Sequence, residues 1–106
     1  MNGLLGMLGQ FRTIQANLEA ALKELAGSKF QGEAGGGVVK VVLSGKKELL
    51  SVELAPSAVD GRGVEALGGL LVSAARDAFD KVEEKRKEKL EAVVGGLPIP
   101  PGLLNI

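Results

Sequence analysis

The sequence has 106 residues and a mass of 10.9 kDa, which is the size of one small domain. Its 13 basic and 13 acidic residues cancel, so net charge alone points to neither a nucleic acid nor an acidic membrane as the partner. The absence of cysteine excludes a disulfide framework and the usual zinc sites, and the absence of histidine removes the commonest general base.

The remaining titratable residues do not suggest a catalytic site. Acidic side chains alternate with lysines at helix positions, which is the pattern of solvated helix surfaces. We therefore expect a protein that is not an enzyme and has no cofactor, metal ion or small-molecule substrate. No apolar run approaches the ~18 residues of a membrane span, and no signal peptide is evident, so we expect a cytoplasmic protein without membrane contact.

Residues 2–26 are predicted to form the first helix, ending at Gly27. Its apolar residues form an unbroken heptad seam, which consists of Leu4, Met7, Phe11, Ile14, Leu18, Ala21 and Leu25. A seam of this kind fits a coiled-coil-like surface for a partner and ordinary packing onto the protein's own sheet equally well. Glycines at positions 3, 6 and 9 weaken the first turns by about 1 kcal/mol each relative to alanine.

Three short strands are predicted within residues 28–55, because apolar and polar residues alternate there with period two. The glycine cluster at 35–37 lacks the residues of a phosphate-binding loop and is predicted to be a hairpin turn. Gly45 is expected to supply the positive φ of the second hairpin, which leaves Lys46 and Lys47 at an exposed tip.

A loop is predicted over residues 57–63, in which Ser57 or Asp60 caps a helical turn. The second long helix is predicted over residues 64–94, followed by an extended, proline-rich tail over residues 95–106. The chain is therefore expected to be a single α+β domain over residues 1–106. Its order is α-β-β-β-α, with a three-stranded antiparallel meander between two long helices. A chain with 16 glycines and no Trp or Tyr builds only a thin core, so we expect it to oligomerise.

The second helix carries one apolar stripe, formed by Leu67, Leu71, Ala75, Ala78 and Val82. Beyond Val82 the same sector turns basic, and Asp77, Asp80, Glu84, Glu88 and Glu91 are expected on the opposite side. About 30 helical residues span ~45 Å, so this helix must project beyond a globule whose radius of gyration is only ~13 Å. A basic face on a projecting arm suits a polyanion, and the predicted nucleic-acid contacts are Lys81, Lys85, Arg86 and Lys89. The alternative is that these lysines only cover the end of the helix with their stems.

The sequence resembles the YbaB/EbfC family of nucleoid-associated proteins. The most specific stretch is Gly32-Glu33, then Gly36, Gly37, Val39, Lys40 and Val41, followed by Gly45 and by Val52-Glu53-Leu54 before Pro56. The helix AARDAFDKVEEKRKEKL and the tail from Leu97-Pro98 to Pro100-Pro101-Gly102 also resemble the family.

The resemblance implies an intertwined homodimer shaped like tweezers, with helical arms that project from a shared sheet. It also implies binding of double-stranded DNA with little sequence preference, in nucleoid organisation or gene regulation. A second class of function stays open on the heptad seam and the neutral charge, namely a dimeric protein-interaction module or accessory factor that does not bind DNA directly.

Overall fold

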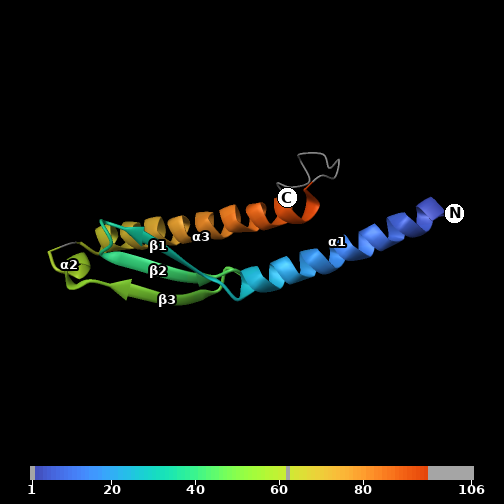
Figure 1. The fold of residues 1–106 in the computed structure, drawn as a ribbon. Coiled ribbons are helices and arrows are strands. Elements are labelled where there is room, and N and C mark those ends of the chain that lie inside the picture. Colours follow the sequence, from blue (N-terminus) through green and yellow to red (C-terminus); the bar gives the residue numbers. More distant parts are fainter. Residues whose placement is uncertain (1, 62, 96–106) are drawn as a thin grey trace.

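The structure, a computed structural model, describes residues 2–61 and 63–95. Its elements follow in the order α1 (Asn2–Ala26), β1 (Lys29–Ala34), β2 (Val39–Ser44), β3 (Leu49–Leu54), α2 (Pro56–Val59) and α3 (Val64–Val94). The α+β class and the order of the two long helices and three strands are confirmed. The molecule is elongated, with extents of 73 × 24 × 16 Å, because both long helices reach far beyond the sheet (Figure 1). The predicted tail lies outside the described residues, apart from Gly95.

The three strands form an antiparallel meander in the order β1-β2-β3. Gly32 of β1 is opposite Val41 of β2, and Val41 is in turn opposite Val52 of β3. Gly35, Gly36 and Gly37 all have positive φ between β1 and β2, as a glycine hairpin turn requires. The predicted hairpin turn is therefore confirmed.

The second hairpin forms for a different reason from the one predicted. Lys47, and not Gly45, has the positive φ, at 65°. Gly45 is needed because the last turn of α1 packs directly on it, and a Cβ there would overlap the carbonyl of Leu25. The hairpin is organised by Ser44, whose hydroxyl accepts hydrogen bonds from the backbone N–H groups of Lys46 and Glu48, each at 3.2 Å.

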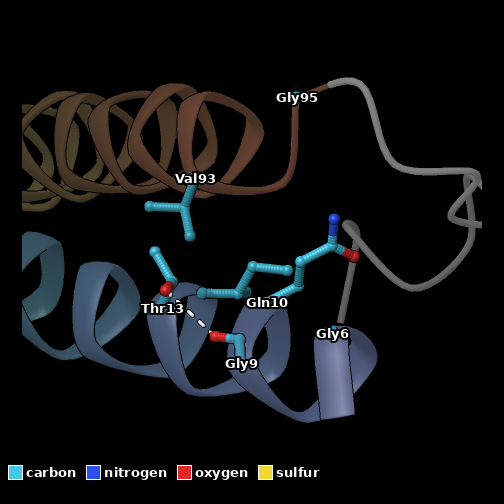
Figure 2. A pocket seen from close by; sticks show the side chains of 7 residues that line it. Gly6, Gly9, Gln10, Thr13, Val93 and Gly95 are labelled. Atoms are coloured by element: carbon cyan, nitrogen blue, oxygen red, sulfur yellow. Dashed lines mark hydrogen bonds between the residues drawn. The ribbon is translucent and has the colours of Figure 1, made fainter. Parts of the chain in front are cut away.

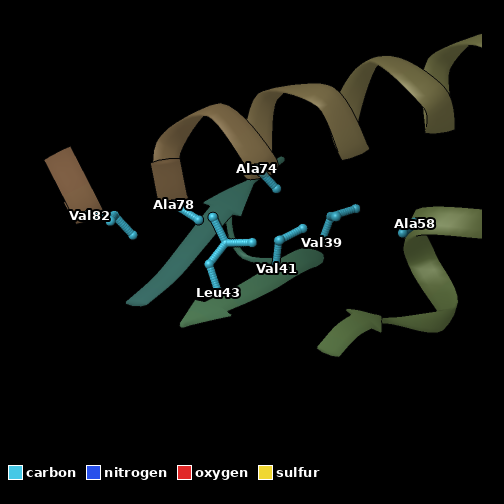
Figure 3. Packing of buried hydrophobic residues seen from close by; sticks show 7 residues of the cluster. All are labelled: Val39, Val41, Leu43, Ala58, Ala74, Ala78 and Val82. Atoms are coloured by element: carbon cyan, nitrogen blue, oxygen red, sulfur yellow. The ribbon is translucent and has the colours of Figure 1, made fainter. Parts of the chain in front are cut away.

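The core lies between the sheet and α3. Figure 3 shows the β2 side chains pointing at one side of α3; the buried cluster consists of Val39, Val41, Leu43, Ala58, Ala74, Ala78 and Val82. Leu67, Leu71 and Ala75 of the predicted stripe are only half-buried, and the stripe omitted Ala74, which is fully buried. The face of α3 that packs on the sheet is therefore rotated from the predicted stripe toward the small residues Ala74 and Ala78. Small residues are needed there because α3 approaches the sheet closely.

Gly32 permits this close approach. A Cβ at position 32 would overlap the carbonyl oxygen of Ala74 and the backbone nitrogen of Ala78, and would lie 2.9 Å from the Cα of Ala78. The backbone of β1 therefore packs directly against the backbone of α3. No other residue type fits there without moving the helix away from the sheet.

The first helix does not pack on the sheet, which was one of the two alternatives for its seam. It runs back along the C-terminal half of α3, and the two helices form a projecting arm (Figure 1). Leu25 at the base of the arm is buried, and Ile14, Leu18 and Ala21 are half-buried, whereas Phe11 near the tip is 67% exposed. No helix in the described part of the chain is long and apolar enough to cross a membrane.

The loop after β3 contains α2, a single helical turn whose N-cap is Ala55 and whose first residue is Pro56. Neither Ser57 nor Asp60 is the N-cap of this turn, but Asp60 is its C-cap, and the backbone N–H of Asp60 donates a hydrogen bond to the carbonyl of Pro56. The fixed φ of proline starts the helix before Ser57, and Asp60 follows its end. The N-cap of α3 is Gly63.

We predict that Gly32→Ala destabilises the fold by about 2–3 kcal/mol, because the added methyl group overpacks a backbone-to-backbone contact. Gly69→Ala is the matched control, since a Cβ at Gly69 meets nothing within 4 Å. It should instead stabilise α3 by about 1 kcal/mol. Urea unfolding followed by circular dichroism at one protein concentration measures both changes. Similar small effects of the two substitutions would contradict the close packing of β1 against α3.

Candidate nucleic-acid interface

The four predicted contact residues lie on α3 between the end of the core and the middle of the arm. All four take part in interactions within the chain, so a continuous, unpaired basic face does not exist on this helix. Lys81 and Lys89 are held by other elements of the fold, whereas Lys85 and Arg86 make local contacts along α3.

Lys81 ties α3 to the edge strand β1. Its Nζ donates a hydrogen bond of 2.7 Å to the carbonyl of Gln31 and lies 3.4 Å from the carboxylate of Asp77. Asp77 in turn accepts a hydrogen bond of 3.0 Å from the backbone N–H of Glu33. This backbone hydrogen bond is the main cause that lowers the pKa of Asp77, with Lys81 contributing less. The prediction that Asp77 lies on the acidic side away from the sheet is therefore wrong, because it faces β1.

Lys89 joins the two helices of the arm. Its Nζ is 3.2 Å from the carboxylate of Glu24 on α1, and its side chain is only 15% exposed. The side chain of this lysine is therefore mostly buried, although it lies beyond the apolar stripe. The cause is α1, which lies alongside and covers the lysine stem.

Lys85 and Arg86 remain accessible. The Lys85 side chain is 50% exposed and lies 3.5 Å from Glu88, and the Arg86 side chain is 37% exposed and lies 4.0 Å from Glu83. Exposed pairs of this kind contribute only about 0–1 kcal/mol, so Lys85 can exchange the Glu88 carboxylate for a phosphate at little cost.

From the sequence, Lys46 and Lys47 are expected at an exposed hairpin tip, with no indication that this tip contacts the arm. The structure brings the two surfaces together, because Lys47 forms an ion pair with Glu83 of α3. A pocket of about 440 Å³ at this junction is lined by Gly45, Lys46, Lys47, Glu83 and Arg86. Three cations thus surround one carboxylate. No periodicity in the sequence could reveal this arrangement, because it depends on where the second hairpin meets α3.

A second pocket lies at the other end of the arm. Figure 2 shows it between the two helices, where Gln10 and Thr13 of α1 face Val93 of α3 and Gly95, which follows the end of α3. Thr13 donates a hydrogen bond of 3.0 Å to the carbonyl of Gly9. No charged side chain of the described residues lines this pocket, so it offers nothing for a polyanion. The described residues also contain no group of carboxylates suited to a metal ion.

Comparison with known proteins agrees with the resemblance found in the sequence. Residues 1–97 match the profile of the YbaB/EbfC DNA-binding family. A nucleoid-associated protein of Mesorhizobium japonicum is 44% identical over 103 residues, which cover 97% of this chain and 96% of the relative. A nucleoid-associated protein of Dictyoglomus thermophilum is 38% identical over 94 residues, 89% of this chain and 90% of the relative.

A solved structure, that of an uncharacterized protein from Helicobacter pylori, has a similar fold. Its TM-score is 0.71 at 25% sequence identity, and the match covers 84% of this chain and 94% of that chain. Because the family profile runs from residue 1 to residue 97 and relatives near 40% identity match along most of their length, this chain belongs to the YbaB/EbfC DNA-binding family.

Proposed function

We propose that the protein is a nucleoid-associated homodimer that binds duplex DNA with little sequence preference, in nucleoid organisation or gene regulation, without catalysis. Membership of a DNA-binding family carries this proposal. Lys46, Lys47 and Arg86 support it, because they line one pocket where the hairpin meets α3, and Lys85 lines a second pocket on α3 beside Phe30. Relatives named as nucleoid-associated proteins support a place in the nucleoid, within the cytoplasm.

The proposed indifference to sequence follows from the chemistry of these side chains. Contacts from lysine and arginine to phosphate position a protein on the duplex but carry no direct sequence information. The chain also has no Trp or Tyr to stack on bases.

Among the four predicted contacts, we propose that Lys85 and Arg86 reach phosphate first. Lys81 and Lys89 would have to leave the Gln31 carbonyl and the Glu24 carboxylate before contacting DNA. Their contribution to binding is therefore proposed to be smaller and to depend on opening of these contacts.

The proposed homodimer would cover an apolar surface that α3 leaves open on β3. Every residue of β3 is exposed, although Val52 and Leu54 are opposite the core residues Val41 and Val39 and so share their side of the sheet. Val72 and Phe79 continue this surface on α3, on the flank that also carries Glu83. We call Leu50, Val52, Leu54, Val72 and Phe79 the β3 face. A second copy that packs here would bury the apolar side chains of the β3 face, which a single chain leaves exposed.

We predict that Val52→Glu, in the centre of the β3 face, converts the dimer to monomer or unfolds it, because dimerisation would bury an unpaired charge. Size-exclusion chromatography with light scattering measures the mass. Met7→Glu is the control, since Met7 is 66% exposed on the arm and lies outside this face. Wild-type protein at the monomer mass of 10.9 kDa would contradict the homodimer, and dimer loss from Met7→Glu alone would place the interface on the arm.

We predict that Lys85→Glu weakens binding to all duplexes alike, because it replaces an attraction to phosphate with a repulsion. The slope of log affinity against log salt should become shallower by about one unit for each phosphate that the variant no longer neutralises. Lys87→Glu is the matched control, with the same change of charge on the same helix, at a residue that lines neither the pocket containing Lys85 nor the pocket at the hairpin. Fluorescence anisotropy at several salt concentrations measures both variants.

Three other outcomes are informative. Equal weakening by Lys85→Glu and Lys87→Glu would indicate diffuse electrostatics and contradict the proposed contact surface. Dependence of the weakening on DNA sequence would contradict backbone binding. A wild-type protein that fails to bind duplex DNA even at low salt would contradict DNA binding and favour the protein-interaction alternative.

A further inference from the structure

One carboxylate, that of Glu83, bridges the two cations that meet at the junction of hairpin and arm. Its Oε1 pairs with Nζ of Lys47, and its Oε2 lies 4.0 Å from Nη1 of Arg86. The side chains of Glu83, Lys47 and Arg86 are 49%, 45% and 37% exposed respectively, so the cluster is open to solvent.

The fold holds the backbone at both of these cations independently of Glu83. The positive φ at Lys47 is stabilised by a 2.9 Å hydrogen bond from its N–H to the carbonyl of Ser44. The hydroxyl of Ser44 accepts two further bonds from the same turn, and the end of α1 packs against Gly45. Arg86 extends from the regular helix α3. The positions from which the two side chains extend are therefore set by backbone structure.

A DNA phosphate offers the same feature as the Glu83 carboxylate: two anionic oxygens that an ammonium and a guanidinium can share. The pocket of about 440 Å³ around Glu83 also contains Lys46, so a phosphate placed there would meet three cations. Glu83 is the single carboxylate among the described residues that line this pocket, and its charge would repel the phosphate.

On the basis of the proposed function, we propose that Glu83 is an internal competitor of DNA phosphate. It occupies the anion position between Lys47 and Arg86, and DNA must displace it to bind at the junction. The competition lowers the affinity of the protein for DNA, so that binding stays reversible.

Protonation would not relieve this competition at neutral pH. The hydrogen bond from Lys47 is the main cause that lowers the pKa of Glu83 below its ordinary value of 4.5. The carboxylate is therefore charged at neutral pH.

The test is Glu83→Gln, which keeps the size of the side chain and one acceptor oxygen but removes its charge. We expect the affinity for duplex DNA to rise roughly two- to fivefold for each engaged protomer, as the strength of surface ion pairs implies. The salt slope should steepen because more phosphate is neutralised. Asp80→Asn is the matched control, because it removes one carboxylate from the exposed side of the same helix.

A third variant makes the test specific. In a Lys47→Gln background, the gain from Glu83→Gln should shrink, because the competitor acts through Lys47. The same gain with and without Lys47 would overturn the proposal, as would equal gains from Glu83→Gln and Asp80→Asn in a protein that binds DNA. Absence of DNA binding by both the wild type and Glu83→Gln would overturn the proposed function together with this inference. Thermal unfolding of each variant checks that the fold is unchanged.

Discussion

The backbone contact between β1 and α3 at Gly32 is the constraint on which the rest of this structure depends. With no side chain between them, helix and strand approach closely enough for Ala74 and Ala78 to fill the core with small groups. In this position α3 covers β1 and β2 and leaves the residues of β3 exposed. The exposed β3 face, and with it the proposed need for a second copy, follows from this one position.

The same geometry produces the arm. Because α3 is longer than the sheet, its second half has no strand beneath it, and α1 supplies the missing partner (Figure 1). Close to the sheet this pairing is well packed, with Leu25 buried and Lys89 enclosed beside Glu24. Toward the tip the contact opens into a pocket between the helices. Some charged residues of the arm, namely Lys89 and Glu24, therefore hold the two helices together, and others remain available to a partner.

Local patterns predicted the elements but not their close contacts. The alternation in the strands and the glycine run at 35–37 are patterns of residues that are adjacent in the sequence. The positions of the helices and strands could therefore be predicted from the sequence alone. Ala74 was missed, and Gly45 was assigned the wrong reason, because both depend on backbones that approach from distant parts of the chain. The same holds for Lys89, whose enclosure by α1 has no signature near Lys89 itself. The junction of Lys47, Glu83 and Arg86 was likewise hidden, since it joins a hairpin to a helix.

The central claim is that DNA is held at the junction between hairpin and arm, and a map of the DNA-contacting residues tests it most directly. The measurement is a series of amide NMR spectra of isotope-labelled protein, recorded as a short duplex of arbitrary sequence is added. We predict that the largest shifts occur at Gly45, Lys46 and Lys47 of the hairpin and at Glu83 and Arg86 of α3, which line one pocket. Shifts concentrated instead at the arm tip around Met7 and Phe11, or on the β3 face, would contradict it.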